Sequence, residues 1–120
     1  LWASNNVFKT EDAANLNNDK LSIYLMMTCL NGYILSPTFD SLAESLMKTP
    51  NGGAIAVWAS TGSTFPDAQL DLSRNVTGTM FRETKGNRMG DLIRKSKQMT
   101  TSQDVRRTWH LIGDPTLIVK

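Results

Sequence analysis

Two almost unbroken apolar runs, separated by one amphipathic segment, constrain the fold of this chain more than any other feature. The first run covers Leu21–Cys29 and the second covers Ala54–Ser60. Runs of this kind, without the alternation of a half-exposed strand, are typical of strands covered on both faces of a parallel sheet. Between them, apolar residues recur with helical spacing from Phe39 to Met47, and Pro50–Gly53 ends that helix. The order strand, helix, strand predicts a βαβ unit with two parallel strands.

The remaining sequence favours helices and one further apolar segment. Thr10, followed by two acidic residues, predicts the start of a short helix. Pro66 begins a longer amphipathic helix, and Met89 begins another. Residues 103–108 are ambiguous, and the final apolar segment is expected to bend at Gly113–Pro115. We therefore expect an α/β fold with a mainly parallel sheet flanked by helices.

The composition excludes several classes of protein. With 40% apolar and 20% charged residues among 120, the chain is long enough for one hydrophobic core and unlike a disordered segment. Cys29 is the only cysteine, which excludes an intrachain disulfide and a multi-cysteine metal site, and neither a metal nor a cofactor is expected. The uncharged stretch Leu21–Phe39 contains turn residues at Asn31-Gly32, so we expect no membrane span there.

Charge is distributed unevenly along the chain. Residues 1–81 carry four basic and seven acidic groups, whereas residues 82–108 carry eight basic and three acidic groups. The formal net charge of +2 gives no general reason to expect a nucleic acid partner. The basic segment could face phosphate or an acidic partner, but a solvated helix face is the simpler interpretation, because no aromatic residues interleave the charges.

Chemistry is expected where the two predicted strands end. Ligands bind beyond the carboxyl ends of strands in open parallel sheets, so Cys29 and residues 59–63 would lie side by side. A lone cysteine at this edge can be a nucleophile if a base removes its proton, or it can be a small buried hydrophobe. The only histidine, His110, lies in an apolar stretch and is interpreted as a structural residue. No base is therefore assigned within the chain.

Four sequence blocks, taken in order and with their spacing, resemble the gingipain-type cysteine peptidases. The blocks are Met26–Tyr33 (MMTCLNGY), Ser41–Leu46 (SLAESL), Gly52–Ser60 (GGAIAVWAS) and Leu111–Leu117 (LIGDPTL). Each block is modest alone, but four in register are specific, and they extend over nearly the whole chain. The resemblance implies a caspase-like α/β fold in which residues 1–120 form the C-terminal part of a single catalytic domain, incomplete at its N-terminus.

The resemblance also implies roles for individual residues. Cys29 matches the catalytic nucleophile, and its backbone N–H would stabilise the oxyanion that forms during the reaction. Gly32 would supply a tight turn after the nucleophile. The general base of the family is a histidine upstream of the cysteine, and we expect it to lie on a segment preceding Leu1, because no histidine comes before Cys29. The loop that lines the primary specificity pocket would be Ala59, Ser60, Thr61, Gly62 and Ser63.

Two functions follow as alternatives. The first is a cysteine endopeptidase that hydrolyses peptide or protein substrates with a Cys-His dyad; without the upstream segment, this chain would be inactive. The second is a catalytically inactive interaction module related to these peptidases. Members of the family are commonly bacterial and exported, so the resemblance implies a secreted or cell-surface location. The cleavage-site preference is left open.

Overall fold

The βαβ unit predicted from the two apolar runs forms the centre of the structure. Strand β1 (Ser22–Leu25), helix α2 (Leu42–Lys48) and strand β2 (Ala54–Ser60) follow one another along the chain. The two strands pair in parallel, with Ile23 opposite Ala56. The helical crossover and the parallel pair are therefore confirmed.

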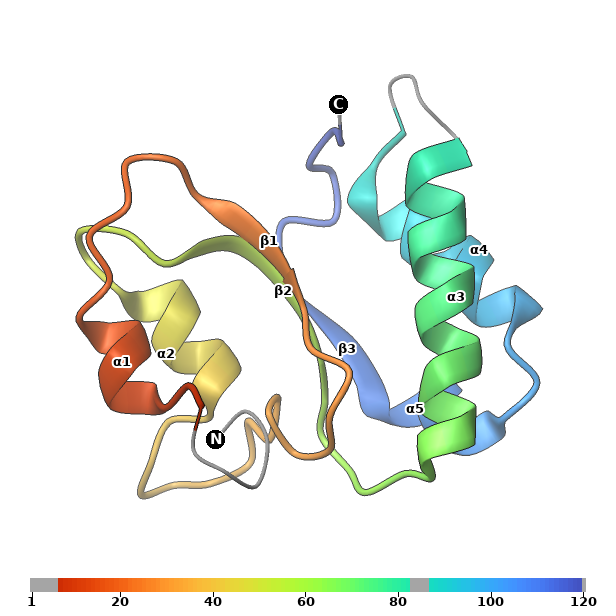
Figure 1. Ribbon diagram of the computed structural model, residues 1–120, viewed down its shortest axis with the longest axis horizontal. Helices are drawn as coiled ribbons and strands as arrows, with labels where there is room; N and C mark the ends of the chain where they lie inside the picture. Colours follow the sequence, from red (N-terminus) through yellow and green to blue (C-terminus); the bar gives the residue numbers. More distant parts are fainter. Residues whose placement is uncertain (1–6, 83–86, 120) are drawn as a thin grey trace.

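Helices cover both faces of a three-stranded sheet in this computed structural model, which describes residues 7–82 and 87–119. Figure 1 shows α1 and α2 on one side of the sheet and α3, α4 and α5 on the other. The predicted helices beginning at Pro66 and Met89 are confirmed, and the ambiguous residues 103–108 form a helix. The elements outside the βαβ unit are α1 (Thr10–Ala14), α3 (Pro66–Arg82), α4 (Met89–Met99), α5 (Gln103–Thr108) and β3 (Trp109–Gly113).

The expectation of a mainly parallel sheet is wrong, because the third strand runs antiparallel to β2. Helix α5 ends beside the carboxyl end of β2, where the backbone N–H of Thr61 donates to the carbonyl of Thr108 at 2.8 Å. Strand β3 begins at the next residue, Trp109, opposite Ser60. The chain thus enters β3 at the end where it leaves β2, and only the antiparallel direction is open to it. The result is a mixed sheet in the order β1-β2-β3.

Strand β1 is shorter and less buried than its almost unbroken apolar run predicts. All residues of β2 except Ile55 are buried, whereas the residues of β1 are at most half-buried. The reason is its place at the edge of the sheet, where it pairs with β2 alone among the described strands. Its last tie to β2 is the bond from the backbone N–H of Met26 to the carbonyl of Trp58, at 2.8 Å. The chain then leaves the sheet and leads to Cys29.

Helix α2 begins three residues later than the apolar spacing predicts. Ser41 caps its N-terminus: the Ser41 hydroxyl accepts from the backbone N–H of Glu44, and the Glu44 carboxylate accepts from the backbone N–H of Ser41. This reciprocal pair satisfies two N–H groups that a helix start leaves free, so the helix begins after it. Phe39 consequently lies outside the helix and is 64% exposed.

The sheet separates two hydrophobic clusters. The cluster under α1 and α2 contains small residues of β2, such as Ala59, whereas the cluster under α3, α4 and α5 is built around Trp58 and Trp109. Trp109 also donates a hydrogen bond from its indole nitrogen to the carbonyl of Met26, at 3.2 Å. This bond crosses the sheet from β3 to the segment after β1 and holds that segment in place.

Candidate functional site

The segments that follow β1 and β2 lie against each other at one end of the sheet. In Figure 1 the chain leaves β1 (orange) and β2 (green) in the same direction, as parallel neighbours must. The backbone N–H of Gly32 donates to the carbonyl of Ser60 at 2.9 Å, which ties the two segments together. Cys29 therefore lies at the carboxyl edge of the sheet, where the sequence places it.

The thiol of Cys29 is free, partly buried and surrounded by hydrogen-bonding groups. The amide nitrogen Nε2 of Gln69 donates to its Sγ atom at 3.1 Å, and the backbone N–H of Thr64 donates to the same atom at 3.4 Å. The thiol in turn donates to the carbonyl of Thr64, also at 3.4 Å. Cys29 is consequently held by polar contacts and is not packed as a plain hydrophobe.

Gln69 and Thr64 are contacts that the sequence reasoning missed. Gln69 lies in the first turn of α3, and its side-chain amide also donates to the carbonyl and the hydroxyl of Thr64, at 3.0 and 3.2 Å. These bonds fix the amide toward the sulfur. Extending the strand-end argument beyond residue 63, to the first turn of the following helix, would have found both residues. The apolar spacing in α3 predicts only which of its residues are buried, and Gln69 is not one of them.

The turn after Cys29 is formed by the two residues that follow it. Leu30 has a positive φ of 62°, a left-handed conformation that costs free energy in a residue with a side chain. Asn31 is buried; its side-chain amide donates to the hydroxyl of Thr28, and its carbonyl accepts from the N–H of Ala43 at 3.0 Å. These bonds keep the turn, and with it Cys29, in one conformation.

Gly32 has a different role from the one expected. The left-handed position in this turn belongs to Leu30, and Gly32 is not among the glycines with positive φ. Gly32 instead allows a close approach of two backbones, since a Cβ atom there would lie 2.9 Å from the Cβ and 3.1 Å from the carbonyl carbon of Ala59. The absence of a side chain lets the Cys29 loop lie against β2.

The five residues expected to line a specificity pocket divide into a buried and an accessible part. Ala59 and Ser60 are fully buried, and the Ser60 hydroxyl donates to the carbonyl of Gly62 at 2.9 Å. Thr61 is anchored to α5, because both its backbone N–H and its hydroxyl donate to the carbonyl of Thr108. Thr61, Gly62 and Ser63 are partly or fully exposed. Only these last three residues can therefore present groups to a ligand.

A pocket of about 350 Å³ lies between the loop that follows Cys29 and the start of α2. Leu30 and Tyr33 contribute to it from the loop, and Phe39 contributes from the segment before α2. Asp40 lies at the same pocket and is paired with Lys48 at 2.5 Å. Apolar and polar residues therefore line this pocket together, and Cys29 is not among them.

His110 lies on β3 opposite Ala59, with an exposed side chain. Partial desolvation lowers the pKa of His110 below its ordinary value, and the positive charge of Lys97 lowers it further, against a backbone contact at Arg107 that raises it. No hydrogen bond joins His110 to Cys29 within residues 7–82 and 87–119. The structure thus provides no contact through which this histidine could take the proton of the thiol.

Two further properties concern metals and membranes. In the described part of the chain, no three side chains among histidine, cysteine, aspartate and glutamate gather in a way that could hold a metal ion. No described helix combines the length and the apolar character needed to cross a membrane.

Comparison with known proteins identifies the family. The profile of peptidase family C25 matches residues 1–120, whereas a comparison with curated proteins finds no match. Among solved structures, the chain resembles the crystal structure of the Arg specific cysteine proteinase gingipain R (RGPB), with a TM-score of 0.72 and 23% sequence identity. That likeness covers 94% of this chain and 29% of the gingipain chain. The resemblance seen in the four sequence blocks is therefore confirmed, and the chain belongs to peptidase family C25.

Proposed function

We propose that this chain is the C-terminal part of a caspase-like catalytic domain of a cysteine endopeptidase, with Cys29 as the nucleophile. The observation that carries the proposal is the convergence of two N–H donors, from Gln69 and Thr64, on the sulfur of Cys29. These hydrogen bonds hold the sulfur in one position at the carboxyl edge of the sheet, where a nucleophile is accessible to a ligand. Membership of peptidase family C25 supports a peptide bond as the substrate.

The reaction uses the thiolate and a backbone donor of the same residue. The Sγ atom attacks the carbonyl carbon of the substrate, and a C–S bond forms while the carbonyl oxygen gains negative charge. The backbone N–H of Cys29 donates no hydrogen bond to a described residue, so it is available to this oxyanion. The C–N bond then breaks, and the amine leaves with a proton from the general acid. Water hydrolyses the thioester and restores the thiol.

The base and acid of this cycle is a histidine on a segment that precedes Leu1, as the resemblance to gingipain-type peptidases implies. His110 is not assigned to this role, because no hydrogen bond joins it to Cys29 within residues 7–82 and 87–119. Residues 1–120 alone are accordingly expected to be inactive and to depend on the upstream segment.

The substrate would lie over the exposed loop that follows β2. Thr61, Gly62 and Ser63 are the accessible residues there, while Ala59 and Ser60 support the loop from inside the core. The substrate class is a peptide or protein. A secreted or cell-surface location is part of the proposal, supported by the resemblance to exported peptidases.

A labelling experiment tests the nucleophile directly. Cys29 is the only cysteine of the 120 residues, so mass spectrometry reports its modification without ambiguity. The protein containing this chain is incubated with a peptide that carries an electrophilic ketone, and the rate is compared with alkylation by iodoacetamide, which needs no peptide recognition. The chain alone and the Cys29→Ser variant are treated in parallel.

We expect the peptide reagent to label Cys29 rapidly in the presence of the upstream segment and slowly in its absence. Hydrolysis of a denatured protein substrate should disappear in Cys29→Ser. Retained hydrolysis in that variant would overturn the assignment of Cys29. If Cys29 reacts with iodoacetamide but never faster with the peptide reagent, the alternative of an inactive interaction module is the correct one.

A further inference from the structure

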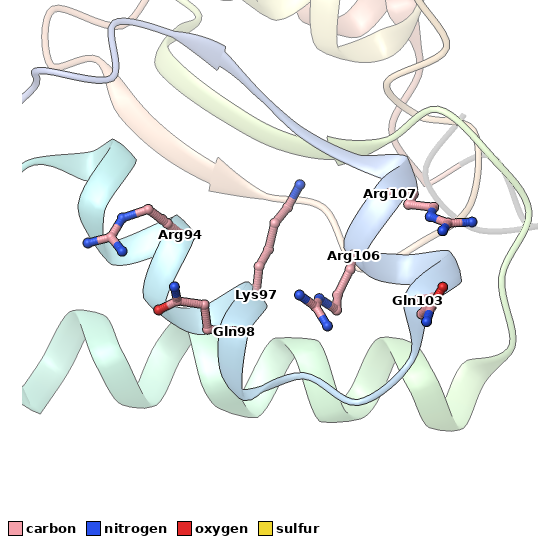
Figure 2. A pocket seen from close by; sticks show the side chains of 6 residues that line it. All are labelled: Arg94, Lys97, Gln98, Gln103, Arg106 and Arg107. Atoms are coloured by element: carbon pink, nitrogen blue, oxygen red, sulfur yellow. The ribbon is translucent and has the colours of Figure 1, made fainter.

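Part of the basic segment, residues 82–108, lines a pocket on the surface and is not a uniformly solvated helix face. A cavity of about 470 Å³ opens between α4 and α5. Figure 2 labels the side chains that line it, which come from both helices. Every side chain of the lining carries an N–H donor and none is acidic; the lining residues are Arg94, Lys97, Gln98, Gln103, Arg106 and Arg107.

The positive charges of this pocket are poorly compensated. Arg94 has one acidic neighbour, Asp91, at 3.9 Å, and both side chains are more than 60% exposed. Lys97, Arg106 and Arg107 form no ion pair with any residue of the described ranges. Four cations around one cavity repel one another, and an anion placed between them relieves that repulsion.

Lys97 is held in place and is not a free surface lysine. Its ammonium lies 5.1 Å from the centre of the Trp58 ring, a cation–π distance, and Trp58 is fully buried. Burial lowers the pKa of Lys97, and the charge of Arg106 lowers it further. In Figure 2 the Arg106 side chain enters the space next to Lys97 from α5. The two helices thus bring two cations together that are nine residues apart in sequence.

Helix α5 connects this pocket to the Cys29 site. Arg106 and Arg107 precede Thr108, whose carbonyl accepts both hydrogen bonds from Thr61. A Cβ atom on Gly62 would lie 2.7 Å from the Cγ2 methyl of Thr108, so the loop and the helix end are in close contact. A peptide chain that crosses the exposed loop after β2 would therefore reach the arginines of α5 next.

From this arrangement we infer that the pocket between α4 and α5 binds a carboxylate-rich segment of the peptide substrate, outside the residues next to the cleaved bond. That the bound peptide is a substrate rests on the proposed peptidase function. The binding of an acidic peptide can be measured without catalysis. Guanidinium groups match carboxylates with paired N–H donors, and Gln98 and Gln103 add neutral donors at the rim.

Binding is tested in the Cys29→Ala variant of the protein containing this chain, so that no ligand is consumed. Fluorescence anisotropy compares a labelled hexaglutamate peptide with a hexaglutamine peptide of the same length. We expect the glutamate peptide to bind at least tenfold more tightly at low salt, and the double variant Arg106→Gln/Arg107→Gln to lose most of that difference. Both arginines are exposed, so their replacement should leave the fold intact, as circular dichroism would verify.

The matched control removes two positive charges elsewhere. Lys20→Gln/Arg74→Gln changes the net charge by the same amount; Lys20 lies before β1, and Arg74 lines a separate pocket on α3. If the control weakens binding as much as the α5 variant does, the effect is one of net charge and the pocket is not the site. Equal binding of the glutamate and glutamine peptides also overturns the inference.

Two further arms identify the ligand and separate the inference from the proposed function. If inorganic pyrophosphate displaces the labelled glutamate peptide at concentrations far below those at which acetate or the unlabelled glutamate peptide does, the pocket is a phosphate site and the acidic-peptide inference is overturned. In the active protein, the glutamate peptide should inhibit hydrolysis of a denatured protein, and Arg106→Gln/Arg107→Gln should relieve this inhibition. The glutamate peptide could bind tightly and through the arginines while Cys29 never reacts with the peptide reagent. That result would reject the peptidase function and the substrate role, and the pocket would be an acidic-peptide site only.

Discussion

The Cys29 site and the pocket between α4 and α5 hold their functional atoms by different physical means. Around the Cys29 sulfur the partners are neutral, namely the amide of Gln69 and the backbone of Thr64, and all lie within 3.4 Å. Around the pocket four of the six lining side chains are charged, and they are spread over a cavity of about 470 Å³. Neutral hydrogen bonds depend on short distances and good angles, whereas charges act over a longer range and are screened by salt.

This contrast explains how each site is supported. The Cys29 loop is fixed by a buried asparagine, a close glycine contact and a bond to Ser60, because a small displacement would remove the contacts of the sulfur. The basic pocket needs no such precision. Its arginines are exposed, and only Lys97 is anchored, over Trp58. Substitutions in the Cys29 loop should therefore change stability and thiol reactivity, whereas substitutions in the basic pocket should change the binding of acidic peptide.

The largest effect is expected from filling the contact between the Cys29 loop and β2. Gly32→Val places atoms where Ala59 already lies, and overpacking of this kind should lower the free energy of unfolding by about 3 kcal/mol. Urea denaturation measures the change. The control is Gly78→Ala, in α3, where no atom lies within 4 Å of the added Cβ and helix propensity favours alanine. Equal stability of Gly32→Val and the parent chain would show that the loop is not tightly packed.

The next effect concerns the donor to the sulfur. Gln69→Leu removes the hydrogen bond of 3.1 Å that positions the sulfur of Cys29, so alkylation by iodoacetamide should slow by about tenfold. Gln98→Leu makes the same change in the basic pocket and should leave alkylation unchanged. A similar slowing in both variants would mean that the two regions are not independent.

Salt should separate the two regions without any substitution. Between low and high salt, the alkylation rate of Cys29 by an uncharged reagent should change by less than about twofold, because its partners are neutral. Binding of the glutamate peptide to the basic pocket should fall by about tenfold or more over the same range. A strong salt dependence of alkylation would contradict the neutral description of the Cys29 site.

The smallest effect is a change in titration. Arg106→Gln removes a charge that lowers the pKa of Lys97, so the pKa of Lys97 should rise while burial continues to lower it below its ordinary value. In the native state the protonated form of Lys97 is disfavoured, so the unfolded chain binds more protons between the two pKa values and stability rises with pH there. The variant should show a smaller rise. NMR titration of the Lys97 side chain and denaturation at several pH values measure both quantities, and an unchanged pKa would contradict the closeness of Arg106.

Several features could be predicted from sequence because they are local. The two apolar runs and the helical spacing between them predicted the parallel pair β1 and β2, since these signals depend on neighbouring residues. The four blocks predicted the family. The start of α2 was missed by three residues, because the capping pair of Ser41 and Glu44 outweighs the apolar residue Phe39.

Other features depend on residues far apart in the chain. The antiparallel direction of β3 follows from the contact of Thr61 with Thr108, which are 47 residues apart. The bond between Cys29 and Gln69 joins residues that are 40 positions apart. Neither hydrophobic periodicity nor local residue spacing predicts such pairs, because they form only when helices and strands pack together.

The amino-acid order alone was enough to establish the βαβ centre, the family and the place of Cys29 at a strand end. It was not enough to show which groups touch the sulfur or that a charged segment encloses a pocket. Local preferences decide where helices and strands form, because they act between near neighbours. Packing of α3 and α5 against the sheet decided the rest, since it brings Gln69 to the thiol and Arg106 to Lys97.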